Sequence, residues 1–226
     1  MTNKSKISLI VVAILLVSAL AIMMSDTGMK QEQQRAVPWL IDTQESDQTK
    51  VVSLNIGKGT LSEMVHTLRK LPELAVFETP DGKRTVEAFF SRVKQGVLIA
   101  NIVAEVDTEG QDFSQLARVD EKGKPMPSGQ WRWNLSKTGI ITVNKWRVWK
   151  LAYIPTTKYS AQQILKFFGQ PDSKKRMGDD VSLLTYEEKA LVITEDSEGR
   201  AIFYYSSKDD YVRLVDSLFV ISTPIK

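Results

Sequence analysis

The chain has 226 residues, of which 42% are apolar and 25% are charged, so it can bury a core. It contains no cysteine, which excludes a disulfide framework, a thiolate zinc site, a thiol nucleophile and a lipid-modified N-terminal cysteine. The net charge is +3, and two of the lysines lie within residues 1–25, which contain no acidic residue. The rest of the chain therefore has 28 basic and 27 acidic side chains, a balance that predicts no nucleic-acid partner.

An uncharged apolar run from Ile7 to Met24 dominates the N-terminus. Eighteen helical residues extend about 27 Å, close to the roughly 30 Å of a bilayer core. Lys4 and Lys6 precede the run, so its N-terminal end should stay in the cytoplasm and the rest should be exported. These features predict a single-pass protein of the bacterial inner membrane, held through residues 7–24, with a periplasmic C-terminal domain. The alternative is a signal peptide cleaved near Ala21, which would release a soluble periplasmic protein.

The chain divides into four predicted segments. Residues 1–25 are a membrane anchor or signal sequence, and residues 26–50 are a polar tether in which Pro38-Trp39-Leu40 has the apolar character to dock on a folded domain. A Gly/Pro-rich loop ends near Ser128 and separates residues 51–128 from residues 129–226. Both of these segments contain a helix followed by strands, which predicts the α+β class, with two tandem modules of a helix and an antiparallel meander.

The first module is predicted to begin with a strand over residues 51–56. A helix over residues 60–71 follows, because Thr60-Leu-Ser-Glu63 has the pattern of a capping box. Strands are expected at residues 74–79, 85–93 and 97–106, the last of them central because it is almost continuously apolar. Residues 112–117 suggest a short closing helix.

In the second module, two strands are expected at residues 131–135 and 140–151, which Gly139 separates, and the repeated plan begins with a strand over residues 148–154. Its helix starts at the capping box Ser160-Ala-Gln-Gln163 and ends at Gly169. Strands are expected at residues 181–187, 190–195 and 200–206, and a closing helix at 209–218. Because the turns between these strands have only two to four residues, neighbouring strands should pair antiparallel.

Residues 156–205 resemble the SmpA/OmlA family and the related repeat of beta-lactamase inhibitor proteins. The residues that carry the resemblance are Phe168-Gly169-Gln170-Pro171-Asp172, Gly178, Leu184-Thr185-Tyr186, Ala190-Leu191-Val192-Ile193 and Gly199-Arg200-Ala201-Ile202-Phe203. Residues 56–106 look like a divergent copy, with Leu71-Pro72-Glu73 in place of the glycine turn. The resemblance implies a helix-plus-meander module that is not an enzyme and that scaffolds envelope assembly or binds and blocks another protein.

No residue pattern in the sequence indicates catalysis, a cofactor or a metal site. His66 has no second histidine and no nucleophile motif to act with, so an exposed or helix-capping role is expected. The acidic pairs at residues 179–180, 187–188 and 209–210 are expected in turns and caps. The Gly57-Lys58-Gly59-Thr60 turn lacks the spacing of a phosphate-binding loop.

Four tryptophans form the most informative cluster, because they alternate with basic residues on two predicted strands. The partner-binding candidates are Trp131, Trp133, Trp146, Arg147 and Trp149. Trp131 and Trp133 should share one face, whereas Trp146 and Trp149 should point to opposite faces, so at least one indole is expected to be partly exposed. Core packing is the competing interpretation.

The sequence therefore predicts a non-enzymatic, membrane-tethered periplasmic protein that binds or scaffolds another envelope protein. Two alternatives stay open at this point. One is an inhibitor or accessory factor of a single envelope enzyme or secretion machine, and the other is a cell-wall or glycan-binding protein that uses the tryptophan and arginine side chains.

Overall fold

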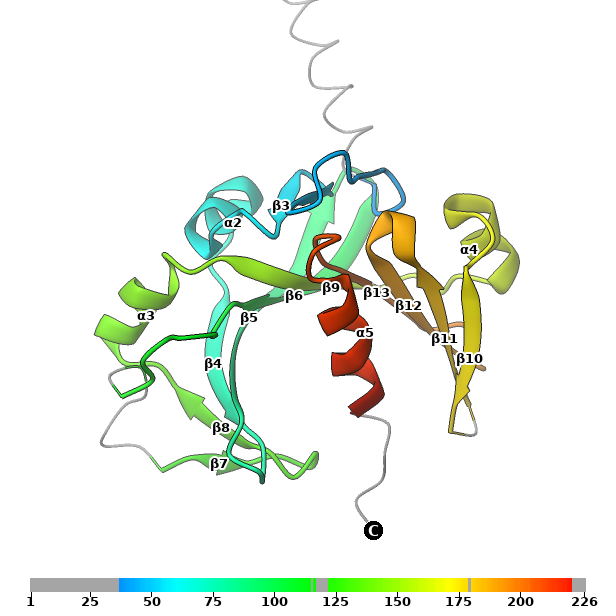
Figure 1. Cartoon of the computed structure of the whole chain (residues 1–226). Helices are drawn as coiled ribbons and strands as arrows, with labels where there is room; N and C mark the ends of the chain where they lie inside the picture. The colour runs from blue at the N-terminus through cyan, green and yellow to red at the C-terminus, as the bar shows by residue number, and fades with distance from the viewer. Residues whose placement is uncertain (1–36, 115, 117–121, 179, 221–226) are drawn as a thin grey trace, which may run out of the picture.

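The computed structural model describes residues 37–114, 116, 122–178 and 180–220. These residues form a large antiparallel sheet, a small sheet and four α-helices (Figure 1). The large sheet has the spatial order β10 (Ser173–Met177), β11 (Val181–Tyr186), β12 (Leu191–Asp196), β13 (Ala201–Tyr205), β9 (Val148–Pro155), β6 (Leu98–Val106), β5 (Arg84–Gln95), β4 (Glu73–Glu78), β8 (Trp131–Asn134) and β7 (Lys124–Pro125). The small sheet has the order β1 (Ile41–Asp42), β2 (Thr49–Val51) and β3 (Leu54–Ile56). The helices are α2 (Leu61–Leu68), α3 (Lys137–Val143), α4 (Ala161–Phe168) and α5 (Tyr211–Val220), with a 3₁₀ turn, η1, at Glu187–Lys189.

The ten strands form one continuous sheet, because β6 and β9 pair at its centre with Ile102 opposite Tyr153. On one side of this junction the chain runs from α2 through β4 and β5 inward to β6, and on the other it runs from α4 through β10, β11 and β12 inward to β13. Every strand pairing is antiparallel. The predicted α+β class and the antiparallel meanders are therefore confirmed. The predicted central position of the apolar strand over residues 97–106 is also confirmed.

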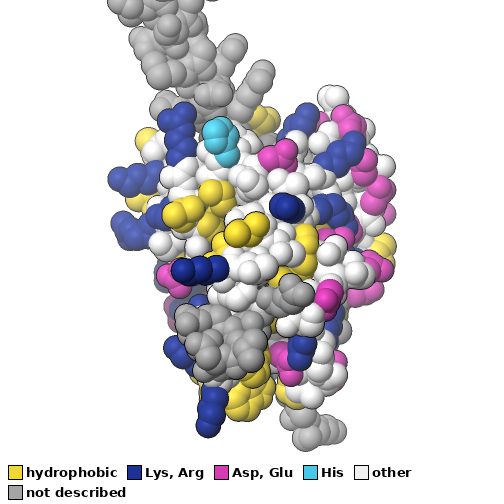
Figure 2. All heavy atoms as spheres, turned by 90° about the vertical axis from the view of Figure 1, so that its left-hand side faces the viewer, with side chains coloured by type: hydrophobic (Ala, Val, Ile, Leu, Met, Phe, Trp, Pro, Cys, Tyr) yellow, Lys and Arg dark blue, Asp and Glu magenta, His cyan; other side chains and the backbone are white. Residues whose placement is uncertain are grey.

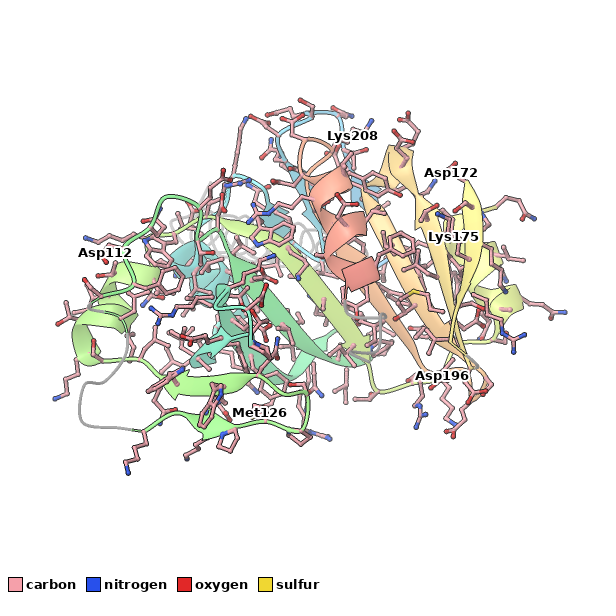
Figure 3. All side chains as sticks on the ribbon, turned by 60° about the horizontal axis from the view of Figure 1, so that its bottom comes forward. Asp112, Met126, Asp172, Lys175, Asp196 and Lys208 are labelled. Carbon is pink, nitrogen blue, oxygen red and sulfur yellow. The ribbon has the colours of Figure 1, made fainter. Side chains whose placement is uncertain are left out.

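The sheet is strongly curved and has a hydrophobic core on each face. On the convex face, α2, α4 and the small sheet cover the strands, and the largest buried rings include Phe90, Phe168 and Phe203 (Figure 1). On the concave face, α5 packs Leu214 and Leu218 against β9, β11 and β12. Figure 3 shows α5 crossing the middle of this face, with Lys175 on β10 at one end of the sheet and Met126 in the β7–β8 turn at the other.

The two predicted capping boxes start the helices α2 and α4. The side chain of Thr60 accepts a hydrogen bond from the Glu63 amide at 3.3 Å, and the Ser160 side chain accepts one from the Gln163 amide at 3.3 Å. In both boxes the side chain of the third helical residue accepts a hydrogen bond from the cap amide in return. Gly169 ends α4 with a positive φ of 83°, which a glycine adopts without strain.

The predicted docking of residues 38–40 occurs on the second half of the sheet. The buried hydroxyl of Tyr205 donates a hydrogen bond of 2.7 Å to the Pro38 carbonyl. The Trp39 indole stacks on Phe167 of α4 with 4.1 Å between ring centroids and 9° between planes. The chain is thus fixed to the domain from its first described residues onward.

Three predicted elements differ from the structure. The expected strand over residues 140–151 is wrong in its first half, because Ser136 caps α3 by accepting a hydrogen bond of 2.9 Å from the Gly139 amide. Ile140, Ile141 and Val143 have β-branched side chains, but this cap and the burial of Val143 outweigh their strand propensity.

The expected strand over residues 51–56 is a hairpin instead. Val52 and Ser53 adopt φ values of 48° and 65°, so the chain reverses between β2 and β3. Of the expected helix over residues 112–117, the described residues form only turns, in which Asp112 accepts a hydrogen bond of 2.8 Å from the Ser114 amide. The prediction also missed β10, whose Ser-Lys-Lys-Arg-Met sequence has no apolar alternation.

The predicted membrane span, residues 7–24, lies outside the described residues. Within the described part of the chain, none of the helices combines the length and the apolar character that crossing a bilayer requires.

Candidate protein-binding surface

Trp146 and Trp149 point to opposite faces of the sheet, as predicted, and both are buried. Trp146 is 8% exposed in the convex-face core, where the ring of Phe113 meets it edge-on at 6.4 Å. Trp149 is 2% exposed in the concave-face core, and the Arg213 guanidinium of α5 lies 3.9 Å from its ring centroid. Packing of both sheet faces therefore places these indoles in the interior and away from a binding surface.

Arg147 links four segments of the chain through its guanidinium. It forms ion pairs with Asp107 after β6 and with Asp210 before α5, and it donates a hydrogen bond of 3.2 Å to the Gly57 carbonyl. Burial alone would lower the pKa of Arg147, but hydrogen bonds to the two carboxylates raise it. Arg213 also pairs with Asp107, at 3.1 Å. Through these contacts, Arg147 connects the start of α5 and the end of the small sheet to the large sheet.

Trp131 and Trp133 lie on one face of β8, where they are opposite Glu78 and Val76 of β4. Trp133 is half-buried against the convex-face core, and a Cβ at Gly123 would approach its ring to 2.7 Å. Trp131 is 45% exposed, so the expectation of one partly exposed indole is confirmed. The structure does not bring the five candidates together into one patch.

An apolar groove lies elsewhere, between α2, the start of β4, β8 and α3, and has a volume of about 380 Å³. Its apolar lining consists of Val65, Leu71, Pro72, Leu74, Leu135 and Ile140. Leu71 is 83% exposed, and Ile141 beside the groove is 62% exposed. Figure 2 shows hydrophobic side chains gathered in the middle of this face, below the histidine and flanked by basic side chains. Clustered exposed apolar side chains of this kind mark interaction sites on proteins.

Local sequence explains why these side chains face solvent. The helix α2 ends at Arg69 in the left-handed conformation, with φ of 49°, and Pro72 prevents the helix from resuming, so Leu71 lies on an extended connection. On α3, Gly139 approaches Leu116 so closely that a Cβ would lie 2.5 Å from the Leu116 carbonyl oxygen. Because α3 packs through Gly139 and Val143, its two isoleucines are left on the outer side.

The chain segments that line the groove also carry four basic residues: Arg69, Lys70, Lys137 and Lys145. None of the four forms an ion pair with another described residue. Of the nearby acidic residues, Glu63 is occupied in the capping box of α2, and Glu73 is exposed at the start of β4. With four basic and two acidic side chains on these segments, the rim of the groove carries a net positive charge.

A second, more polar cavity of about 680 Å³ lies on the other side of α2, against β2 and β3. Its lining includes His66, Glu63 and Lys50, and it shares Ser62 with the apolar groove. His66 is exposed, as predicted. No group of three or more His, Cys, Asp or Glu side chains suited to a metal ion occurs within the portion described. The helix α2 is thus a ridge with a cavity on each flank.

No family model matches the sequence, and no curated protein or solved structure matches the chain. The resemblance of residues 156–205 to the SmpA/OmlA family and to beta-lactamase inhibitor proteins therefore stays a prediction.

Proposed function

We propose that the protein is a non-enzymatic, inner-membrane-tethered component of the bacterial envelope that binds another envelope protein through the apolar groove. The supporting observation is the groove itself, where Leu71 and Ile140 are exposed beside basic side chains that have no described ion-pair partner. Leaving Leu71 in water forgoes about 1.5–3 kcal/mol of burial energy, which a partner that covers it would recover. Association through such a site needs no catalytic residue.

The tether in this proposal is the apolar run over residues 7–24, with the C-terminal domain in the periplasm because Lys4 and Lys6 precede the run. The two halves of the sheet, each with a helix that precedes an inward-running meander, support a tandem arrangement of two modules. In this arrangement both modules line the groove, because α2 and β4 lie within residues 51–128 whereas β8 and α3 lie within residues 129–226.

Site-specific photo-crosslinking in native membranes tests the proposal. A photoreactive amino acid replaces Leu71 or Ile140 in the full chain, and matched controls carry it at Val97 or Val212, which are 97% and 70% exposed away from the groove. We expect the same protein adduct from both groove positions and none from the controls. Equal labelling at groove and control positions, or no protein adduct at all, would refute binding through the groove.

A further inference from the structure

We propose that the groove between α2 and α3 takes a short amphipathic helix of the partner, with large aliphatic residues on one face and Asp or Glu residues beside them. This inference rests on the proposed function and specifies the chemistry of the partner. Three features of the groove support it, namely the surrounding backbone, the apolar floor and the charge of the rim.

The backbone around the groove favours side-chain recognition over strand addition. β4, which contributes Leu74 to the floor, pairs with β5 along its whole length and with β8 from Ala75 to Glu78, so only Glu73 and Leu74 have an edge that β8 leaves free. An edge of two residues is too short to hold an added strand, which favours a partner that enters the groove with its side chains. Two of the walls are helices, and a third helix laid between them can pack its ridges into theirs.

The apolar floor offers aliphatic side chains from three segments of the chain to one face of a helix. Val65 projects from α2, Leu71 and Leu74 from the connection and the start of β4, and Ile140 from α3. They line one continuous cavity of about 380 Å³. An amphipathic helix presents anchors at positions i, i+3 or i+4, and i+7, and two or three such aliphatic side chains can enter a groove of this kind together.

The charge around the groove selects the sign of the partner. Arg69 and Lys70 precede Leu71, whereas Lys137 and Lys145 lie at the two ends of α3, so positive charge is present on both sides of the floor. A helix with acidic residues beside its aliphatic face is attracted by these side chains, and a helix with basic residues is repelled. The attraction should weaken with added salt, because the rim is exposed.

A selection experiment on the full chain in detergent tests this inference. The probe is a displayed library of 18-residue helices with Leu fixed at i, i+3, i+4 and i+7 and with Glu, Lys, Gln or Ser at the remaining positions. We expect enrichment of Glu-rich members. Enrichment of Lys-rich members, or no charge preference, would overturn the proposal, as would the absence of any enrichment.

Affinities of the enriched peptides, measured by fluorescence anisotropy, then locate the site. Leu71→Asp and Ile140→Asp should each weaken binding at least tenfold, and Val212→Asp, on the exposed side of α5, should leave it unchanged. The double variant Lys137→Glu/Lys145→Glu should weaken the acidic peptides at least fivefold and bind Lys-for-Glu peptides more tightly. The distant control Lys166→Glu/Lys174→Glu should do neither. Equal effects of the groove and control variants would contradict the site.

The inference and the proposed function fail in different ways. If both groove positions crosslink one envelope protein, and mass spectrometry places the adduct in an extended or basic segment, the groove binds a protein but the acidic-helix proposal is wrong. If the library selects acidic helices at the groove but no protein adduct forms in native membranes, the groove chemistry is correct and the proposed function is wrong.

Discussion

Replacing Trp149 tests whether this residue belongs to the core that holds α5. Its indole is 2% exposed, packs in the cluster with Leu214 and Leu218, and lies under the Arg213 guanidinium. The indole N–H of Trp149 has no hydrogen-bond acceptor among the described residues. Two substitutions therefore separate two contributions, because Ala removes the ring and Phe removes only the larger ring system and its N–H.

The expected magnitudes follow from burial. A buried Trp removes roughly 200 Å² from water, so Trp149→Ala should lower the free energy of unfolding by about 3–5 kcal/mol. Trp149→Phe keeps an aromatic surface beneath Arg213 and also removes an unpaired buried donor, whose burial costs about 1–3 kcal/mol. The Phe variant should therefore lose less than about 1.5 kcal/mol.

Urea unfolding of the full chain in detergent measures these values. Phe168→Ala provides the reference for a core residue, since Phe168 is 2% exposed and its ring lies 5.1 Å from that of Phe203. Trp131→Ala provides the exposed reference and should cost less than about 1 kcal/mol. A stability loss for Trp149→Ala that resembles the loss for Trp131→Ala would refute the assignment of Trp149 to the core.

Three further predictions concern the pH dependence of stability and one helix cap. Burial and the neighbouring Glu105 carboxylate raise the pKa of Glu87, so the ionisation of Glu87 destabilises the fold as the pH rises above about 4.5. Glu87→Gln should therefore raise the Tm at pH 7 but not at pH 4. The control Glu73→Gln, on the exposed end of β4, should leave the Tm unchanged at both pH values. Burial acts to raise the pKa of Asp107, but hydrogen bonds from Arg147 and Arg213 outweigh this effect and lower the pKa. Asp107→Asn should therefore lower the Tm at pH 7, and the difference in Tm from the unchanged protein should shrink as the pH falls through the lowered pKa. A difference in Tm that does not change with pH would contradict this prediction. Ser160→Ala should cost about 1 kcal/mol in urea unfolding through loss of the α4 cap, and Gln162→Ala on the exposed side of the same helix is its control.

The predictable parts of the fold are those that local chemistry determines. The capping boxes at Thr60 and Ser160 and the short turns between strands act within a few residues, and the structure confirms them. The strand β10 could not be predicted from its own sequence, which is polar, because pairing with β11 is what stabilises it. The helix α3 was not predicted because its β-branched residues suggest a strand. The close approach of Gly139 to Leu116, through which α3 packs, depends on the tertiary fold.

The candidate site shows the same division. The sequence correctly predicts that Trp146 and Trp149 lie on opposite faces, although Trp146 precedes β9 and does not take part in its alternation. It cannot show that both faces are covered, since α5 and the small sheet come from distant parts of the chain. The groove was missed for a similar reason, because its walls come from α2, β4, β8 and α3. A sequence signal did exist in Leu71, because the following Pro72 disfavours a helical conformation at this residue, and α2 ends before it at Leu68.

The clamp on residues 38 and 39 has a mechanical consequence. Tension on the chain before residue 37 is first resisted by the hydrogen bond from Tyr205 to the Pro38 carbonyl and by the Trp39–Phe167 stack. Tyr205 belongs to β13, which has β12 on one side and β9 on the other, so the clamp is attached to an interior strand that two ladders hold in place. An edge strand such as β10 would instead unzip one hydrogen bond at a time. Until the clamp breaks, tension from the N-terminal side is therefore kept away from β1, the edge strand of the small sheet that begins at Ile41.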